Sequence, residues 1–374
     1  MDRPSVSLRT AALGALVSGT IIAACGGKTT YEPDGGGNGG EGGTGSSTSS
    51  GMVGAQPPPP PADAPAGDGP GHSFVFHKLW YGDTDRNGTP SGQAWKEYGY
   101  NLDGKISTKD ATDLCQPFVG GSKSLVYPDG NAGIDNAFGK VLLALFASFQ
   151  ADLSAQVNGN IMAGHYSYLI RVEALGAGAS YGGLLALYYR GSSLDELPAF
   201  DGSDVWPVTA ESLSSPPDLT SALVQFPQSY VNGQTWVSGP PSAIHMTMVM
   251  EGFELALPLT NAVITMDLAP DRSGASNGII AGVLEVEPLI HEFQKVAGSF
   301  SEALCEGTTF DSLADQLRQG ADILSSCSSD TPASCQHPAM TCDAISVGIG
   351  FEARSAQLGE VAAPVPPQPD PCEP

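Results

Sequence analysis

The sequence predicts a mainly β protein with added helices, an antiparallel β-sandwich-like core and a disordered N-terminal tether. Runs of alternating apolar and polar residues recur between positions 166 and 286, which is the period of a half-buried strand. Turn-forming pairs, Glu251-Gly252 and Thr260-Asn261, separate these runs as in an antiparallel meander. A scarcity of large apolar residues before position 72 predicts the tether.

Residues 1–24 have the organisation of a secretory signal peptide. Arg3 and Arg9 precede an uncharged apolar run from Ala11 to Ala24, which is 14 residues long. A transmembrane helix needs about 20 apolar residues, so this length is typical of the apolar region of a signal peptide. The run ends in Ile22-Ala23-Ala24-Cys25-Gly26. An ordinary signal peptide followed by an incidental cysteine is the alternative interpretation.

The end of this segment resembles the lipobox of bacterial lipoproteins, in which small residues precede a cysteine whose thiol receives diacylglycerol before cleavage in front of it. The resemblance implies that Cys25 is lipidated and becomes the mature N-terminus. In that family an Asp after the cysteine commonly retains the protein in the inner membrane. Because this position is Gly26, the resemblance implies an anchor in the outer membrane of the cell envelope.

Residues 25–71 are predicted to form a disordered tether after the lipidated cysteine. Glycine and proline make up half of positions 26–71, and Leu, Ile, Phe and Trp do not occur there. Such a segment cannot bury enough apolar surface to offset the entropy lost on ordering. We therefore expect the folded part to begin at about His72.

Residues 72–362 are expected to form one folded, β-rich region. Four strands are predicted in the stretch 244–286, where isoleucine, methionine and leucine alternate with polar residues. The methionines on this face are expected to fill the core. Three further strands are predicted nearer the N-terminus, at Tyr166 to Leu175, Leu184 to Tyr189 and Ser221 to Tyr230.

Helical periodicity predicts three helices, near residues 135–157, 287–300 and 309–325. The first shows an apolar stripe at i, i+4, i+7, i+11 and i+15 from Phe138 to Leu153. Its uncharged centre is too short to span a membrane. After the third helix, residues 363–374 are a proline-rich tail, which is expected to stay extended unless Cys372 fastens it.

Six cysteines besides Cys25 predict three disulfides, because an even number in an exported chain is typical of oxidised pairs. We expect Cys327 to pair with Cys335 across a Ser- and Asp-rich loop, and the other four to tie the tail and the C-terminal helices to the body. A metal site at Cys327, Cys335, His337 and Cys342 is the alternative, but these spacings lack a CxxC pair. The six cysteines are Cys115, Cys305, Cys327, Cys335, Cys342 and Cys372.

Two acidic turns predict a structural Ca²⁺ site. Tyr81-Gly82-Asp83-Thr84-Asp85-Arg86-Asn87-Gly88 resembles the opening of a calcium loop, in which oxygens at alternate positions surround one cation and a glycine allows the sharp turn. The position expected to carry the final Glu of an EF-hand is Ala94, so the loop does not close a site alone. A second turn around Asp103 can complete it. The predicted ligands are Asp83, Asp85, Asn87 and Asp103; two ordinary Asx turns without an ion are the alternative.

A serine or carboxylate-dependent hydrolase is the alternative function. Gly178-Ala179-Ser180-Tyr181-Gly182 matches the G-x-S-x-G nucleophile elbow, which requires a strand before the serine and a helix after it. The runs on both sides of Ser180 are predicted to be strands, which leaves no room for that helix. His291 would follow in the expected chain order, yet it lies in a predicted helix one turn after Glu287.

The chain carries 16 Lys+Arg against 40 Asp+Glu, a net charge of −24. This balance argues against a nucleic-acid partner and favours attraction of divalent cations. The lipobox, the Gly/Pro tether, the segment from Trp80 to Ser107 and the proline-rich end together resemble the exported lipoproteins of myxobacterial-type genomes, a resemblance that implies no activity and no site residues. We expect a lipid-anchored envelope protein whose extracytoplasmic β-rich domain has a structural role or binds a partner such as a glycan or an envelope protein, with the membrane contacted through its anchor.

Overall fold

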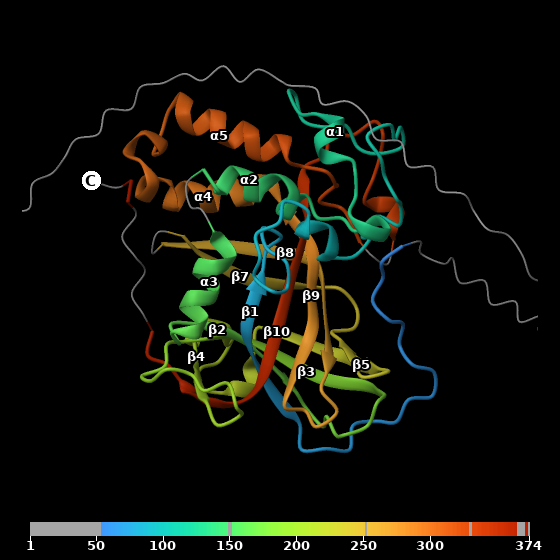
Figure 1. The fold of residues 1–374 in the computed structure, drawn as a ribbon, viewed down its shortest axis with the longest axis vertical. Helices are drawn as coiled ribbons and strands as arrows, with labels where there is room; N and C mark the ends of the chain where they lie inside the picture. Colours follow the sequence, from blue (N-terminus) through green and yellow to red (C-terminus); the bar gives the residue numbers. More distant parts are fainter. Residues whose placement is uncertain (1–53, 149–151, 251–252, 329–330, 365–370, 373–374) are drawn as a thin grey trace, which may run out of the picture. The chain divides into compact units, whose positions relative to one another are not determined.

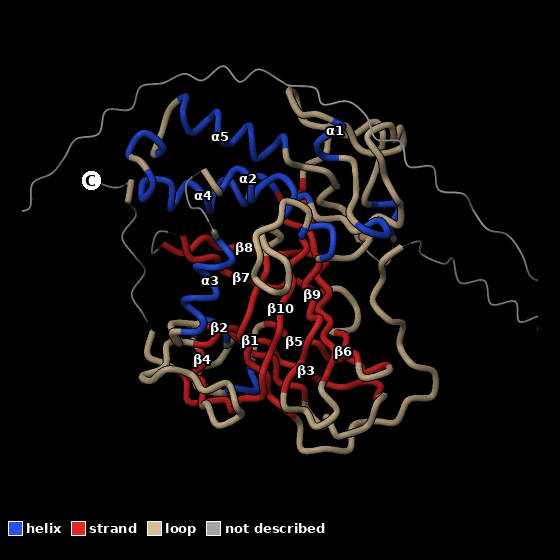
Figure 2. Tube along the Cα trace, viewed as in Figure 1, coloured by secondary structure: helices blue, strands red, loops and turns tan. Residues whose placement is uncertain are grey.

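The computed structural model describes residues 54–148, 152–250, 253–328, 331–364 and 371–372. The signal peptide, Cys25 and the first part of the predicted tether lie outside the described residues. The predicted fold class, mainly β with added helices, is confirmed (Figures 1 and 2). The strands are β1 His72–Trp80, β2 Ser167–Val172, β3 Tyr181–Gly191, β4 Val205–Val208, β5 Val224–Asn232, β6 Thr235–Val237, β7 Ser242–Met250, β8 Phe253–Leu268, β9 Gly274–Glu285 and β10 Ala344–Val361.

Eight of these strands form a sheet that closes on itself. The pairing runs β1–β2–β3–β5–β6–β8–β9–β10 and returns from β10 to β1, with every neighbour in this ring antiparallel. Ser73 on β1, for example, lies opposite both Ala356 on β10 and Arg171 on β2. Strand β7 pairs with β8, and β4 runs parallel to β10. The sequence does not predict this closure.

The inner face of the ring carries the main core. Phe74 and Phe76 of β1 point inward, and Phe76 stacks on Phe351 of β10 with ring centroids 4.1 Å apart. Most helices lie together at one end of the strands (Figure 1), where Phe146 stacks on Phe293 at 5.8 Å, whereas the helix Leu153–Met162 packs beside β1. The helices are α1 Lys123–Val126, α2 Leu143–Phe146, α3 Leu153–Met162, α4 Val286–Phe300 and α5 Thr308–Gln319.

The predicted helices are present with shifted bounds. The segment 135–157 divides into a π-helical turn, Phe138–Leu142, followed by α2, and then α3. Helix α4 matches the second prediction, whereas α5 ends before residue 325 because Gly320 follows Gln319 and terminates it.

One predicted turn is wrong. Thr260-Asn261 lies inside the single long strand β8, where the pairing register with β9 shifts between Thr260 and Val263. Asn261 adopts a left-handed backbone conformation with φ 49°, which lets the strand bulge without ending. The other predicted turn, Glu251-Gly252, lies outside the described residues.

Residues 54–71, which the sequence places in the tether, follow a defined path along the folded region. We call this segment the strap. Its backbone exchanges hydrogen bonds with the loops beside it: Ala55 N donates to Ala132 O at 2.8 Å, and Gly69 N donates to Ala174 O at 3.0 Å. The boundary predicted at residue 71 is therefore too late, because a proline-rich chain can order on existing side chains without a core of its own.

Three disulfides join the six described cysteines. Cys327 pairs with Cys335, as predicted, and Cys305 pairs with Cys372, which fastens the tail beside the C-terminal helices. Cys115 pairs with Cys342 across 227 positions of sequence. Disulfides persist in oxidising compartments, so the folded region is extracytoplasmic.

Candidate functional site

A polar cleft of about 490 Å³ opens on the outer face of the closed sheet. The outer face is the side of the strands turned away from the main core. Residues 192–222 cover part of this face near β1, β2 and β3, where Trp206 and Leu213 pack on Val75 and Leu169. The cleft lies beside this cover and is lined by Gly71, His72, Ser73, Arg171, Glu173, Leu187, Tyr189, Leu219, Thr220, Ser355, Ala356, Gln357 and Leu358.

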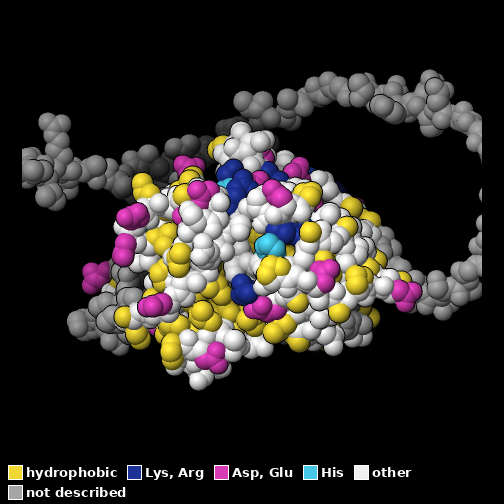
Figure 3. All heavy atoms as spheres, turned by 90° about the horizontal axis from the view of Figure 1, so that it is seen from below, with side chains coloured by type: hydrophobic (Ala, Val, Ile, Leu, Met, Phe, Trp, Pro, Cys, Tyr) yellow, Lys and Arg dark blue, Asp and Glu magenta, His cyan; other side chains and the backbone are white. Residues whose placement is uncertain are grey.

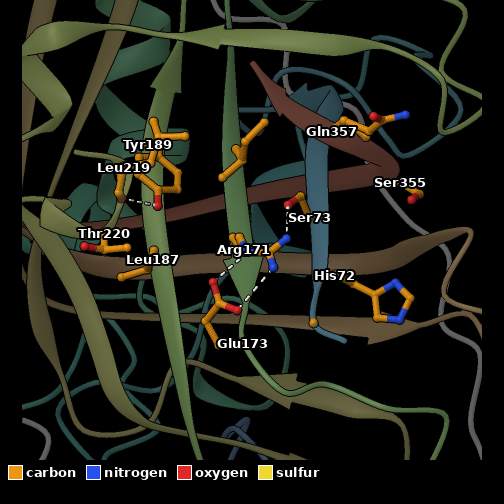
Figure 4. A pocket seen from close by; sticks show the side chains of 13 residues that line it. His72, Ser73, Arg171, Glu173, Leu187, Tyr189, Leu219, Thr220, Ser355 and Gln357 are labelled. Atoms are coloured by element: carbon orange, nitrogen blue, oxygen red, sulfur yellow. Dashed lines mark hydrogen bonds and ion pairs between the residues drawn. The ribbon is translucent and has the colours of Figure 1, made fainter. Parts of the chain in front are cut away.

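Arg171 stands at the centre of the cleft (Figure 4). Because side chains two residues apart on an extended backbone share a face, Glu173, one residue past the end of β2, lies next to it. The guanidinium binds the carboxylate in a bidentate manner, with Nε–Oε1 at 2.6 Å and Nη2–Oε2 at 3.2 Å. Nη1 donates to the Ser73 hydroxyl at 3.2 Å. The pair is therefore held in a fixed orientation while both side chains stay about one-third exposed.

The two sides of the cleft differ in chemistry (Figure 4). On one side Leu187, Leu219 and the ring of Tyr189 form an apolar wall, and the Tyr189 hydroxyl donates to Leu219 O at 2.7 Å. On the other side His72, Ser355 and Gln357 present an imidazole, a hydroxyl and an amide. This arrangement offers both hydrogen-bond donors and acceptors beside an aliphatic surface.

Cationic side chains gather on one face of the molecule, although the chain as a whole is acidic. Figure 3 shows Lys, Arg and His side chains near the middle of the face viewed from below, while most Asp and Glu side chains in view lie around them. Burial, together with the charges of Arg272 and Arg171, lowers the pKa of His72. At neutral pH the ring is therefore uncharged and can both donate and accept a hydrogen bond.

The predicted calcium ligands take up protein hydrogen bonds and do not all come together. Asp83 accepts from the Ser154 backbone N–H at 3.0 Å and from its hydroxyl, and Asp85 Oδ1 accepts from Asn87 N at 2.8 Å. Asp103 belongs to a different set of contacts around Asp135. No three His, Cys, Asp or Glu side chains of the described ranges are arranged to hold a metal. Calcium binding stays a prediction.

Asp103 lies in a buried cluster of four carboxyl groups that the sequence analysis missed. Asp135 Oδ2 accepts from Leu102 N at 2.7 Å and Asp103 N at 3.3 Å, and Asp129 accepts from the Ser107 N–H. Asp322 accepts from Ser346 N and Oγ at 2.8 and 2.6 Å. The Asp-Gly pair at 129–130 resembles that at 103–104 and is the signal that could have drawn attention to it.

Burial is the main cause of the raised pKa values in this cluster, and the charges of the neighbouring carboxylates add to the effect. It raises the pKa of Asp129 to about 8 and that of Asp322 to about 6. It also raises the pKa of Asp103 and, further, that of Asp135. The nearby Lys140 has its pKa lowered to about 8 by burial, and its ammonium donates to Pro128 O at 2.6 Å. The cluster thus links several loops through buried carboxyl groups whose pKa values are raised.

Ser180 lacks the setting of a hydrolase nucleophile. It lies in the turn between β2 and β3, so a strand follows it where the elbow requires a helix. Its hydroxyl accepts a weak hydrogen bond from Gly233 N at 3.4 Å. His291 is exposed on α4 and is the last histidine before His337. No contact between Ser180 and a histidine occurs in the described part of the chain.

A search with protein-family models found no match, and neither the curated proteins nor the solved structures yielded a significant one. Among the helices that the structure describes, none has the length and apolar character needed to cross a membrane.

Proposed function

We propose that this chain is a lipid-anchored protein of the cell envelope whose extracytoplasmic β-rich domain binds a saccharide in the cleft around Arg171. The signal peptide and the lipobox resemblance at Cys25 support the anchor, and Gly26 supports an outer-membrane address. The disulfides support the extracytoplasmic side. The fold supplies a rigid outer face on which β1, β2, β3 and β10 hold the site.

The observation that carries the binding proposal is the Arg171–Glu173 fork set between hydroxyl, amide and aliphatic surfaces. A sugar ring presents hydroxyl groups at its edge and C–H groups on its faces, so it needs fixed donors and acceptors next to an apolar wall. The fork supplies both a donor and an acceptor. Leu187 and Tyr189 supply the wall. Pockets with a few placed polar groups beside apolar side chains are typical binding sites.

An array of envelope-type oligosaccharides, followed by calorimetry with the bound ones, tests this function. Arg171→Gln should weaken binding at least tenfold, because the substitution removes a charged hydrogen bond of about 1.5–3 kcal/mol. Arg318→Gln is the matched control: Arg318 makes a similar bidentate pair with Glu287 at 2.7 and 2.9 Å on the helices. Equal losses in both variants, or an array without any bound saccharide, would contradict the proposal.

The surroundings of Ser180 give no support to a serine hydrolase, because a strand follows this residue and its described hydrogen bond is to Gly233 N. The acidic composition, 16 cationic against 40 anionic residues, supports a partner other than nucleic acid.

A further inference from the structure

The strap covers an apolar groove on another part of the outer face, and no residue lines both this groove and the cleft. The groove encloses about 700 Å³ between the strap and strands β5, β6 and β8. Its floor is formed by Tyr230, Val237 and Val263, which pack together on the outer face. In Figure 1 the strap is the blue segment that runs outside the strands toward the bottom of the view.

Strand β5 holds the strap through side chains at alternate positions. The Tyr230 hydroxyl donates to Pro58 O at 2.6 Å, and Asn232 Nδ2 donates to Pro59 O at 2.9 Å. The run of five prolines at residues 57–61 favours the polyproline II conformation, whose carbonyl groups remain free to accept hydrogen bonds. The groove therefore already binds one extended proline segment through its backbone oxygens.

The row of donors on β5 extends beyond the strap. Gln228 lies two residues before Tyr230, lines the groove and is exposed. Its side-chain amide has no hydrogen-bond partner among the residues that the structure describes. The strap does not bind the Gln228 amide; its residue Gln56 instead donates from Nε2 to Asn101 O at 2.5 Å. One donor and the volume beside it are thus left unused.

The walls of this volume fit an uncharged, extended ligand. Tyr100 and Tyr230 line the groove, and both hydroxyls are already bonded, to the Thr265 hydroxyl at 2.7 Å and to Pro58 O. The described residues that line it include no Asp, Glu, Lys, Arg or His. Proline rings of the strap and Pro240-Pro241 complete the walls. Aromatic-lined grooves of this kind bind proline-rich segments, which lose little entropy on binding.

We propose that this groove binds a proline-rich extended segment of a partner protein, which lies beside the strap and accepts a hydrogen bond from Gln228. The strap forms one wall of the site, so the partner segment packs proline against proline and tyrosine. The proposal concerns a protein partner and stands apart from saccharide binding in the cleft.

Fluorescence polarisation of labelled decaproline with the full chain tests the proposal. We expect saturable binding, and Gln228→Ala should weaken it about fivefold, the effect of losing one neutral hydrogen bond. Gln225→Ala is the matched control, because the Gln225 amide on the same strand donates to Ala222 O at 2.9 Å outside the groove. Arg171→Gln should leave the affinity for decaproline unchanged. Far-UV circular dichroism of each variant checks that it is folded.

Three outcomes would overturn the proposal. The first is the absence of saturable binding up to about 1 mM decaproline, the limit of weak affinity. The second is an equal loss of decaproline affinity in the Gln228 and Gln225 variants. The third is an increase of more than about fivefold in the decaproline affinity of Tyr230→Phe. This substitution loosens the strap, so the increase would show that the probe replaces the strap.

Discussion

Raising the pH from about 6.5 to about 7.5 should destabilise the folded domain through its buried carboxyl cluster. A carboxyl whose pKa is raised on folding contributes stability that is fully present below its unfolded pKa, near 4, and is lost as the pH rises through its folded pKa. For Asp129 the folded pKa is about 8. Each proton retained in the folded state lowers the free energy of unfolding by about 1.4 kcal/mol per pH unit. With Asp135 also retaining its proton, we expect a loss of about 1 to 3 kcal/mol across this interval.

Urea unfolding at the two pH values, in EDTA, measures this loss. Burial lowers the pKa of His77 to about 4 and that of Lys140 to about 8, so both groups act in the opposite direction and make the loss smaller across this interval. Asp129→Asn keeps an acceptor for the Ser107 N–H and should reduce the slope by about 1.4 kcal/mol per pH unit. Asp195→Asn, an exposed substitution, should leave it unchanged. A free energy of unfolding that stays constant or rises in wild type would refute the reasoning.

Metabolic labelling with a palmitate analogue should mark the wild type and fail to mark Cys25→Ser, and label that persists in the variant would disprove lipidation there. Reduction of the three disulfides should raise the intact mass by six hydrogens, whereas free thiols on three or more cysteines would contradict the pairing. Replacing both Cys115 and Cys342 by Ala should lower the free energy of unfolding by up to about 5 kcal/mol in urea, because the loop they close is long. Calcium should raise the melting temperature of the wild type by several degrees relative to EDTA and should have no such effect on Asp83→Ala with Asp85→Ala; equal wild-type midpoints would leave these residues as turn formers.

The strands that sequence reasoning found and missed differ in how many of their faces are buried. The stretch 244–286 alternates because one face meets the core, and its strands are present as β7, β8 and β9. Strands β1 and β10 were not predicted. Eight consecutive residues from Ala344 to Phe351 are buried, since the core lies on one side and covering loops on the other. Two buried faces remove the alternation on which the prediction depends.

The candidate site was beyond sequence reasoning for a related reason. Its residues come from four strands whose pairing is long-range, so no motif joins Ser73, Arg171 and Gln357 along the chain. The spacing of Arg171 and Glu173 was the one local signal, because residues two apart on a strand share a face. Asp103 was predicted only as a calcium ligand, and its place beside Asp129 and Asp135 depends on how the loops pack.

Pairing of β1 with β10 also determines when this protein can finish folding during export. The strand that closes the ring, Ala344–Val361, is the last to leave the translocation machinery, and until then His72–Trp80 has an open edge where its final partner belongs. A chain in this state exposes unpaired backbone groups that can pair with other chains. Its folding also requires contacts between residues that are far apart in sequence, which are formed slowly. Chaperones that hold newly made chains unfolded should therefore affect the yield of this protein more strongly than that of one whose strands pair only with sequence neighbours.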